Sequence, residues 1–83
     1  MTAADLLKIC REKAGISQDK LAAQMHRSQS DVSRYERGKQ TIDITTFRDW
    51  TKITNHVEVG IAFLYGVDPA TILQTILQVS GAA

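Results

Sequence analysis

Cysteine, long apolar runs and metal-ligand clusters are scarce or missing in this 83-residue sequence. Its single cysteine, Cys10, cannot form a disulfide within the chain. Cys10 shares one helical stripe with Leu6 and Ala14, so we expect a small buried side chain rather than a reactive thiol. No apolar run is long enough to span a bilayer and no signal peptide is recognisable. We therefore expect a cytoplasmic protein with no membrane contact.

Residue types that serve in catalysis are present but not in catalytic arrangements. Cys10, His26 and His56 lack the spacing of a metal site. The sequence also contains no recognisable pairing of nucleophile and base, no Gly-rich phosphate loop and no paired carboxylates. With 43% hydrophobic residues, the chain can bury one modest core but not a sizeable substrate cleft. We expect no enzyme, no cofactor and no metal.

Net charge is small, but it is unevenly distributed along the chain. The whole sequence carries ten Lys and Arg against nine Asp and Glu, a net charge of +1. Residues 1–39 hold eight of the basic residues and five of the acidic ones, net +3, whereas residues 40–83 hold two and four, net −2. Positive charge concentrated in one half favours a polyanionic partner for that half.

The stretch from Gly15 to Lys39 (GISQDKLAAQMHRSQSDVSRYERGK) has the pattern of two short helices joined by a tight turn. Ser17 and Ser28 stand where an N-cap side chain would accept from the first amides of each helix, and Asp31 completes a variant capping box with Ser28. Each helix is too short to be stable alone, so we expect the two to pack together and on a third. Apolar residues recur at helical spacing on both sides of the turn: Leu21, Ala22, Met25, Val32 and Tyr35.

One face of the second helix carries hydrogen-bonding side chains without the usual solubilising Glu or Lys. On a wheel of about 100° per residue, the arc opposite Val32 and Tyr35 holds Gln29, Ser30, Ser33, Arg34 and Arg37. For an arbitrary amphipathic helix, such an arc is a solvated face. Here the residue types favour base reading, because Gln pairs bidentately with adenine, Arg with guanine, and Ser reaches either. The acidic Asp31 would repel phosphate unless it caps its own helix.

At these residues the chain resembles the Cro and phage-repressor type helix-turn-helix family. The resemblance spans roughly residues 5–66 and is densest in SQDKLAAQM and SDVSRYERGK. It implies an all-α, lambda-repressor-like DNA-binding domain of five or six helices. The resemblance also implies roles for individual residues: base contacts for Gln29, Ser30 and Arg34, a DNA-backbone contact for Gln18, phosphate contacts for Arg37 and Lys39, and an ion pair between Arg11 and Glu36.

The turn between the two helices departs from the family pattern at two positions. His26 stands where Gly is usual because the backbone there is left-handed, a conformation that His adopts at some energetic cost. Arg27 follows where an apolar residue is common. We interpret His26 as structural or close to phosphate, and we place Arg27 among the phosphate contacts.

Helix signals continue outside the motif. Thr2 and Asp5 predict a capping box for a first helix that ends at Gly15, and Gly38 is expected to end the recognition helix in the same way. A fourth helix is expected between Asp43 and Asn55, with Phe47 and Trp50 in the core. The segment from Val57 to Tyr65 fits both strand alternation and helical spacing, and the family resemblance favours a helix.

The last segment is expected to be a helix from about Pro69 to Val79, with Asp68 as its N-cap. Its apolar residues cover about half of the wheel and residues 69–83 carry no charge, which suggests association with a partner. We therefore divide the chain into a helix-turn-helix domain, residues 1–66, and a dimerisation helix, residues 67–83. The expected dimer contacts are Ile72, Leu73, Ile76, Leu77 and Val79. Burial of this helix in its own monomer is the alternative.

These observations predict a homodimeric, sequence-specific transcription regulator of prokaryotic or phage type, associated with the nucleoid. Repression is the simplest mode, and two-fold symmetry fits a palindrome whose half-sites lie about one helical turn apart in double-stranded DNA. The alternative is an interaction module, an adaptor or an antitoxin component, that uses the same fold to hold a partner protein. An adaptor would not need the polar arc of Gln29, Ser30, Ser33 and Arg34.

Overall fold

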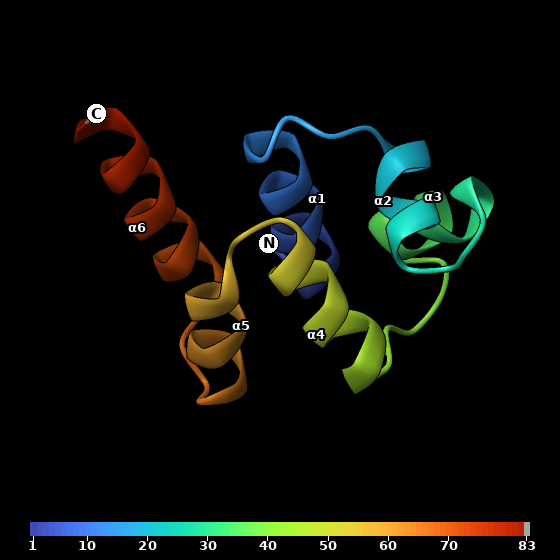
Figure 1. Cartoon of the computed structure of the whole chain (residues 1–83). Helices are drawn as coiled ribbons and strands as arrows, with labels where there is room; N and C mark the ends of the chain where they lie inside the picture. Colours follow the sequence, from blue (N-terminus) through green and yellow to red (C-terminus); the bar gives the residue numbers. More distant parts are fainter. Residues whose placement is uncertain (83) are drawn as a thin grey trace.

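The structure, a computed structural model, describes the backbone of residues 1–82 and the side chains as far as Gln78. Helices and their connections account for all of the described backbone, as expected for an all-α chain (Figure 1). The helices are α1 (Ala3–Lys13), α2 (Gln18–Gln24), α3 (Gln29–Glu36), α4 (Ile44–Ile53), α5 (Val57–Leu64) and α6 (Pro69–Ala82).

Polar side chains start the helices at the positions that the sequence predicts. Thr2 and Asp5 form a complete capping box on α1, and Ser28 and Asp31 form a second one on α3. Ser17 accepts from the backbone of Lys20 at the start of α2. These side chains satisfy amides that have no partner within the helix, which is why such short helices begin where they do.

Left-handed residues end five of the helices, among them α5, which is followed by Gly66 at φ +88°. Gly15 follows α1 at φ +73° and Gly38 follows α3 at φ +70°, as predicted. His26 and Asn55 adopt the same conformation at φ +57° and +61°, after α2 and α4. An L side chain in this region is strained, so the His26 turn is held by the packing of the helices on either side.

The first of two cores joins α1, α2, α3 and α4. The indole of Trp50 is fully buried, donates from Nε1 to the Leu7 carbonyl at 2.9 Å, and meets the Tyr35 ring edge-on at 6.3 Å. Phe47 is also buried, so the prediction of core roles for Phe47 and Trp50 is confirmed. The buried members of this core are Leu7, Leu21, Ala22, Met25, Val32, Tyr35, Phe47 and Trp50.

Residues 57–64 form a helix and not a strand, as the family resemblance favours. Gly60 allows α5 to approach α4 closely, because a Cβ at this position would lie 3.2 Å from Thr51 Oγ1 and 3.3 Å from the Phe47 ring. The alternating pattern of the sequence therefore arises from a short helix that buries Val59 and Gly60 and leaves Val57 and Ile61 exposed.

The second core joins α1, α5 and α6, and it includes two of the residues expected at the dimer contact. Ile72 and Ile76 are 4% and 7% exposed because they pack on Leu6, Cys10 and Val59 of their own chain. Leu73 is half-buried and Leu77 is exposed, while the side chain of Val79 lies outside the described residues. Burial raises the pKa of the Cys10 thiol to about 12, in agreement with a packing role.

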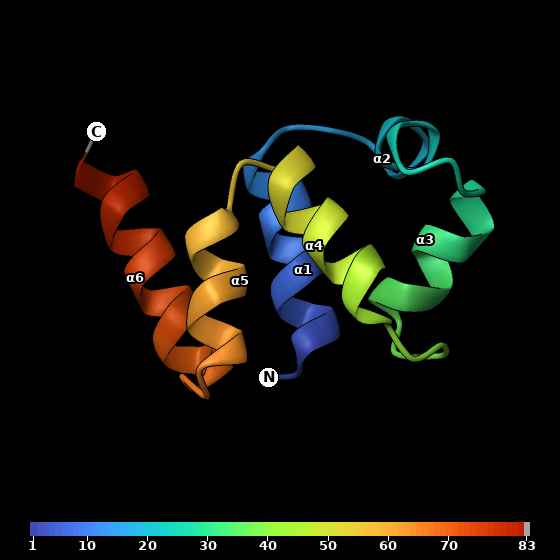
Figure 2. The same cartoon turned by 60° about the horizontal axis from the view of Figure 1, so that its bottom comes forward.

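The helices form an elongated body of 33 × 26 × 18 Å. The pair α2 and α3 lies at one end and α6 at the other, with α1, α4 and α5 between them (Figures 1 and 2). Within residues 1–82, no helix has both the length and the apolar character needed to cross a membrane.

Candidate nucleic-acid interface

Helices α2 and α3 pack directly on each other and form one end of the molecule (Figure 2). Leu21 and Ala22 of α2 and Val32 of α3 are buried at their contact. The small Ala22 side chain lets the two backbones come close, as helices joined by a short turn require. The opposite side of α3 is left at the surface.

The outward side of α3 carries the arc of polar side chains. Gln29, Ser30 and Arg37 are exposed, and Ser33 and Arg34 are half-buried. Lys39 follows Gly38 and is also exposed. The structure thus brings six predicted contact residues onto or just beyond one short helix, where four form a surface of hydrogen-bond donors and Arg37 and Lys39 are two flanking cations.

A chain of hydrogen bonds connects Gln29 to the interior. Its Nε2 donates to Gln18 Oε1 at 2.7 Å, and Gln18 Nε2 donates to Glu36 Oε1 at 2.8 Å. Gln29 keeps its own Oε1 and one N–H for an outside partner, the pair that recognises adenine. Gln18 therefore acts on this surface by orienting Gln29, besides any contact of its own.

Glu36 and Arg11 anchor this network in the domain. Arg11 donates from Nε and Nη2 to the two Glu36 oxygens at 2.5 and 3.1 Å, and from Nη1 to the Ile16 carbonyl at 2.9 Å. Only 12% of the Arg11 side chain and 2% of the Glu36 side chain are exposed. The hydrogen bond to Glu36 raises the pKa of Arg11, so the guanidinium stays charged.

Arg34 is held from both ends of its guanidinium. Its Nη2 forms an ion pair with Asp31 Oδ1, and its Nε donates to Gln40 Oε1 at 3.3 Å. Gln40 in turn donates to the hydroxyl of the buried Tyr35 at 3.2 Å. The spacing of Asp31 and Arg34 by three residues is readable in the sequence. The role of Gln40 is not, because it lies beyond the helix end, where only the folded backbone decides what it reaches.

Arg27 contacts residues outside α2, and its phosphate contact stays a prediction. Its Nη2 donates to Thr46 Oγ1 at 2.8 Å and lies 3.7 Å from Asp43 Oδ1, and its guanidinium stacks 5.5 Å from the Tyr35 ring centroid. Arg27 therefore links the turn to the start of α4. These contacts explain why a basic residue replaces the apolar one that is common in the family.

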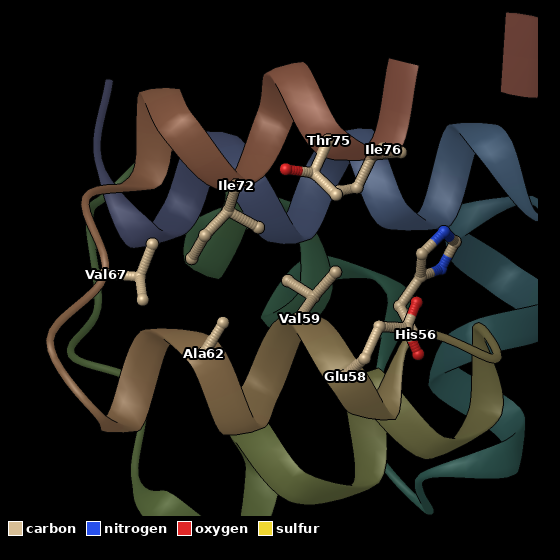
Figure 3. A pocket seen from close by; sticks show the side chains of 8 residues that line it. All are labelled: His56, Glu58, Val59, Ala62, Val67, Ile72, Thr75 and Ile76. Atoms are coloured by element: carbon tan, nitrogen blue, oxygen red, sulfur yellow. The ribbon is translucent and has the colours of Figure 1, made fainter. Parts of the chain in front are cut away.

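The groove between α5 and α6 has a different chemical character (Figure 3). It has a volume of about 340 Å³, and Ile72 and Ile76 point across it toward Val59 of α5. Glu58 and His56 stand at one end, and no Lys or Arg lines it. A polyanion would meet no lysine or arginine here, so the outward side of α3 remains the candidate site. Among the described residues, no group of three His, Cys, Asp or Glu side chains is placed to hold a metal.

Similarity to known proteins agrees with this geometry. The family model described as a helix-turn-helix domain matches residues 3–73, which include α2, α3 and the helices packed around them. No curated protein and no solved structure matches the chain. Because the matched segment covers most of the sequence, the chain belongs to the helix-turn-helix domain family, whose Cro and repressor-type members bind DNA.

Proposed function

We propose that this protein is a sequence-specific transcription regulator that binds a palindromic operator as a homodimer and represses by occupying a promoter. The observation that carries the proposal is the braced polar surface of α3. Gln29 is oriented through Gln18 and Glu36, and Arg34 is oriented by Asp31 and Gln40. Pre-oriented amide and guanidinium groups on an exposed helix suit bidentate recognition of base edges in the major groove.

The same surface divides into base readers and positioning groups. Gln29, Ser30, Ser33 and Arg34 are the proposed base readers, since they lie on the outward side of α3. Arg37 and Lys39 lie at the end of the helix and just beyond it, where cations meet the phosphates that flank the groove. Residues 1–39, which include α3, carry a net charge of +3. This positive charge supports the proposal that the side of the molecule with α3 faces DNA.

The geometry argues against α6 as the dimer contact. Helices α3 and α6 lie at opposite ends of a body 33 Å long (Figures 1 and 2). Two copies joined end to end through α6 would separate their recognition helices by far more than the roughly 34 Å of one helical turn. The inward side of α6 is also already used by the second core.

A better dimer contact is the side of α4 and α5 that we call the outer apolar face, made of Ile44, Val57, Ile61, Leu64 and Tyr65. All five side chains are exposed, Ile61 to 54% and Leu64 to 60%. Ile44 lies at the end of α4 nearest α3 (Figure 2), so a second copy seated here keeps the two recognition helices closer together. An exposed apolar patch on so small a domain favours association, and a two-fold partner presents the same patch.

Selection of bound duplexes from a random DNA pool, followed by mobility shift, tests the proposal. The expected product is an inverted repeat whose half-site centres are about 10 base pairs apart, bound by two chains. Enrichment of a single half-site would contradict the dimer but keep the base reading. Failure to enrich any sequence would contradict the proposal and favour the alternative, in which the fold holds a partner protein.

A further inference from the structure

We propose that Asp31 is a specificity-determining residue, which fixes the reading edge of Arg34 and makes binding to every non-matching sequence less favourable. This inference rests on the proposed DNA binding. Asp31 puts a negative charge on the helix that approaches a polyanion, where a carboxylate opposes binding.

Both oxygens of the Asp31 carboxylate are occupied. Oδ2 accepts from the Ser28 backbone N–H at 3.3 Å and completes the capping box, while Oδ1 holds Arg34 Nη2. The Ser28 hydrogen bonds, followed by the Arg34 charge, lower the pKa of Asp31, so it stays ionised at neutral pH. Ser28 alone would cap the helix, and the carboxylate charge is therefore available for a second role.

The two contacts of Arg34 determine which of its five N–H groups remain available to donate to DNA. Nε faces Gln40 and one N–H of Nη2 faces Asp31. The two N–H groups of Nη1 and the other one of Nη2 are left at the end of the side chain, which is 43% exposed. An end-on pair of these donors matches the O6 and N7 acceptors of guanine. A free arginine would instead rotate to reach phosphates, which all sequences offer.

The charge of Asp31 changes the affinity for every DNA sequence, whereas the orientation of Arg34 changes the affinity only for sequences with one particular base. The carboxylate weakens the attraction of any duplex, since it opposes the phosphates that Arg37 and Lys39 meet. Only a site with guanine at the right position recovers the lost affinity through Arg34. Asp31 thus increases the ratio of specific to non-specific affinity while it decreases non-specific affinity.

The variant Asp31→Asn tests this directly, because an amide oxygen can still accept at the cap while the charge is gone. Asp5→Asn is a matched control: Asp5 holds the same position in the capping box of α1, its hydrogen bonds go to Thr2 and not to Arg34, and its replacement changes net charge equally. We expect Asp31→Asn to bind a scrambled duplex about threefold or more tightly. Its ratio of affinity for the selected site over the scrambled duplex should fall about tenfold.

Repeating the change in an Arg34→Ala background identifies the mechanism. There Asp31→Asn should still strengthen non-specific binding but leave the affinity ratio unchanged. An unchanged ratio in the single variant, an equal fall in Asp5→Asn, or an equal fall without Arg34 would overturn the inference. Gln40→Ala, which releases Arg34 Nε without touching the cap, should lower the ratio as well and serves if Asp31→Asn does not fold. If the parent itself prefers no duplex, the proposed function fails with it.

Discussion

Glu36 is the residue that connects the stability of this domain to its candidate site. Its carboxylate receives three hydrogen bonds, two from Arg11 and one from Gln18. Replacing Glu36 by Ala would leave the Arg11 charge without its partner in a nearly dry environment, and we expect unfolding free energy to fall by about 3 to 5 kcal/mol. Denaturant unfolding at neutral pH measures this change.

The control for Glu36→Ala is Asp49→Ala. Asp49 pairs with Arg48 at 3.2 Å on the surface, where 65% of the Arg48 side chain is exposed. Exposed pairs contribute about 0 to 1 kcal/mol, so this variant should unfold close to the parent. If both variants lose the same small amount, the buried network does not stabilise the domain as described.

His26 gives a prediction about backbone strain in the turn between α2 and α3. Its backbone is left-handed at φ +57°, a conformation in which Gly has no Cβ clash. We expect His26→Gly to be more stable than His26→Ala by about 1 kcal/mol, since both lose the imidazole and only Ala keeps the strained Cβ. Thermal unfolding of the two variants decides the matter. Equal stability would show that the turn is not strained.

At the scale of elements, α3 combines groups whose effects on DNA binding should separate. Arg34→Ala removes a bidentate base contact, so we expect a loss of about 1 to 3 kcal/mol on the operator and relaxed preference at one position per half-site. Lys39→Ala removes a phosphate contact and should weaken all sequences alike. Mobility shifts on single-base variants of the operator measure both effects. Unchanged preference in Arg34→Ala would place the reading surface elsewhere.

Helix boundaries were the part of this structure most readable from the sequence. Thr2, Ser17, Ser28 and Asp43 start the helices at which they were expected, because a cap is a local interaction between near neighbours. Asn55 ends α4 for an equally local reason. The family resemblance, and not the apolar pattern, identified residues 57–64 as a helix.

Contacts between distant residues could not be read in the same way. Spacing alone does not show that Arg27 contacts Thr46 and Tyr35. Nor does it show that Ile72 and Ile76 face α1, since an apolar stripe looks alike whether its own core or a partner covers it. The ion pair of Arg11 and Glu36 came from the family resemblance, because the two residues are 25 positions apart.

At the scale of the whole molecule, the outer apolar face predicts how two copies meet. Ile61→Asp places a charge on that face without disturbing the core, because Ile61 is already 54% exposed. We expect this variant to sediment as a monomer at concentrations where the parent is a dimer, since an unpaired charge in an apolar contact is strongly unfavourable. Helical content should not change.

Leu77→Asp is the matched control for Ile61→Asp. Leu77 is 47% exposed on α6, so it receives the same change at a similar exposure but at the opposite side of the second core. It should remain dimeric. Dissociation of Leu77→Asp with an intact Ile61→Asp dimer would restore α6 as the contact, and a monomeric parent would rule out both surfaces.

The central claim, that α3 reads base sequence while flanking cations meet phosphate, is tested most directly by affinity as a function of salt. Fluorescence anisotropy would compare the selected duplex with a scrambled duplex of equal length and composition. Neutralising about six phosphates per dimer predicts a log-log salt slope of about −5, with a preference for the selected duplex of at least about 10³ at physiological salt. Equal affinity for the two duplexes at physiological salt would contradict the claim.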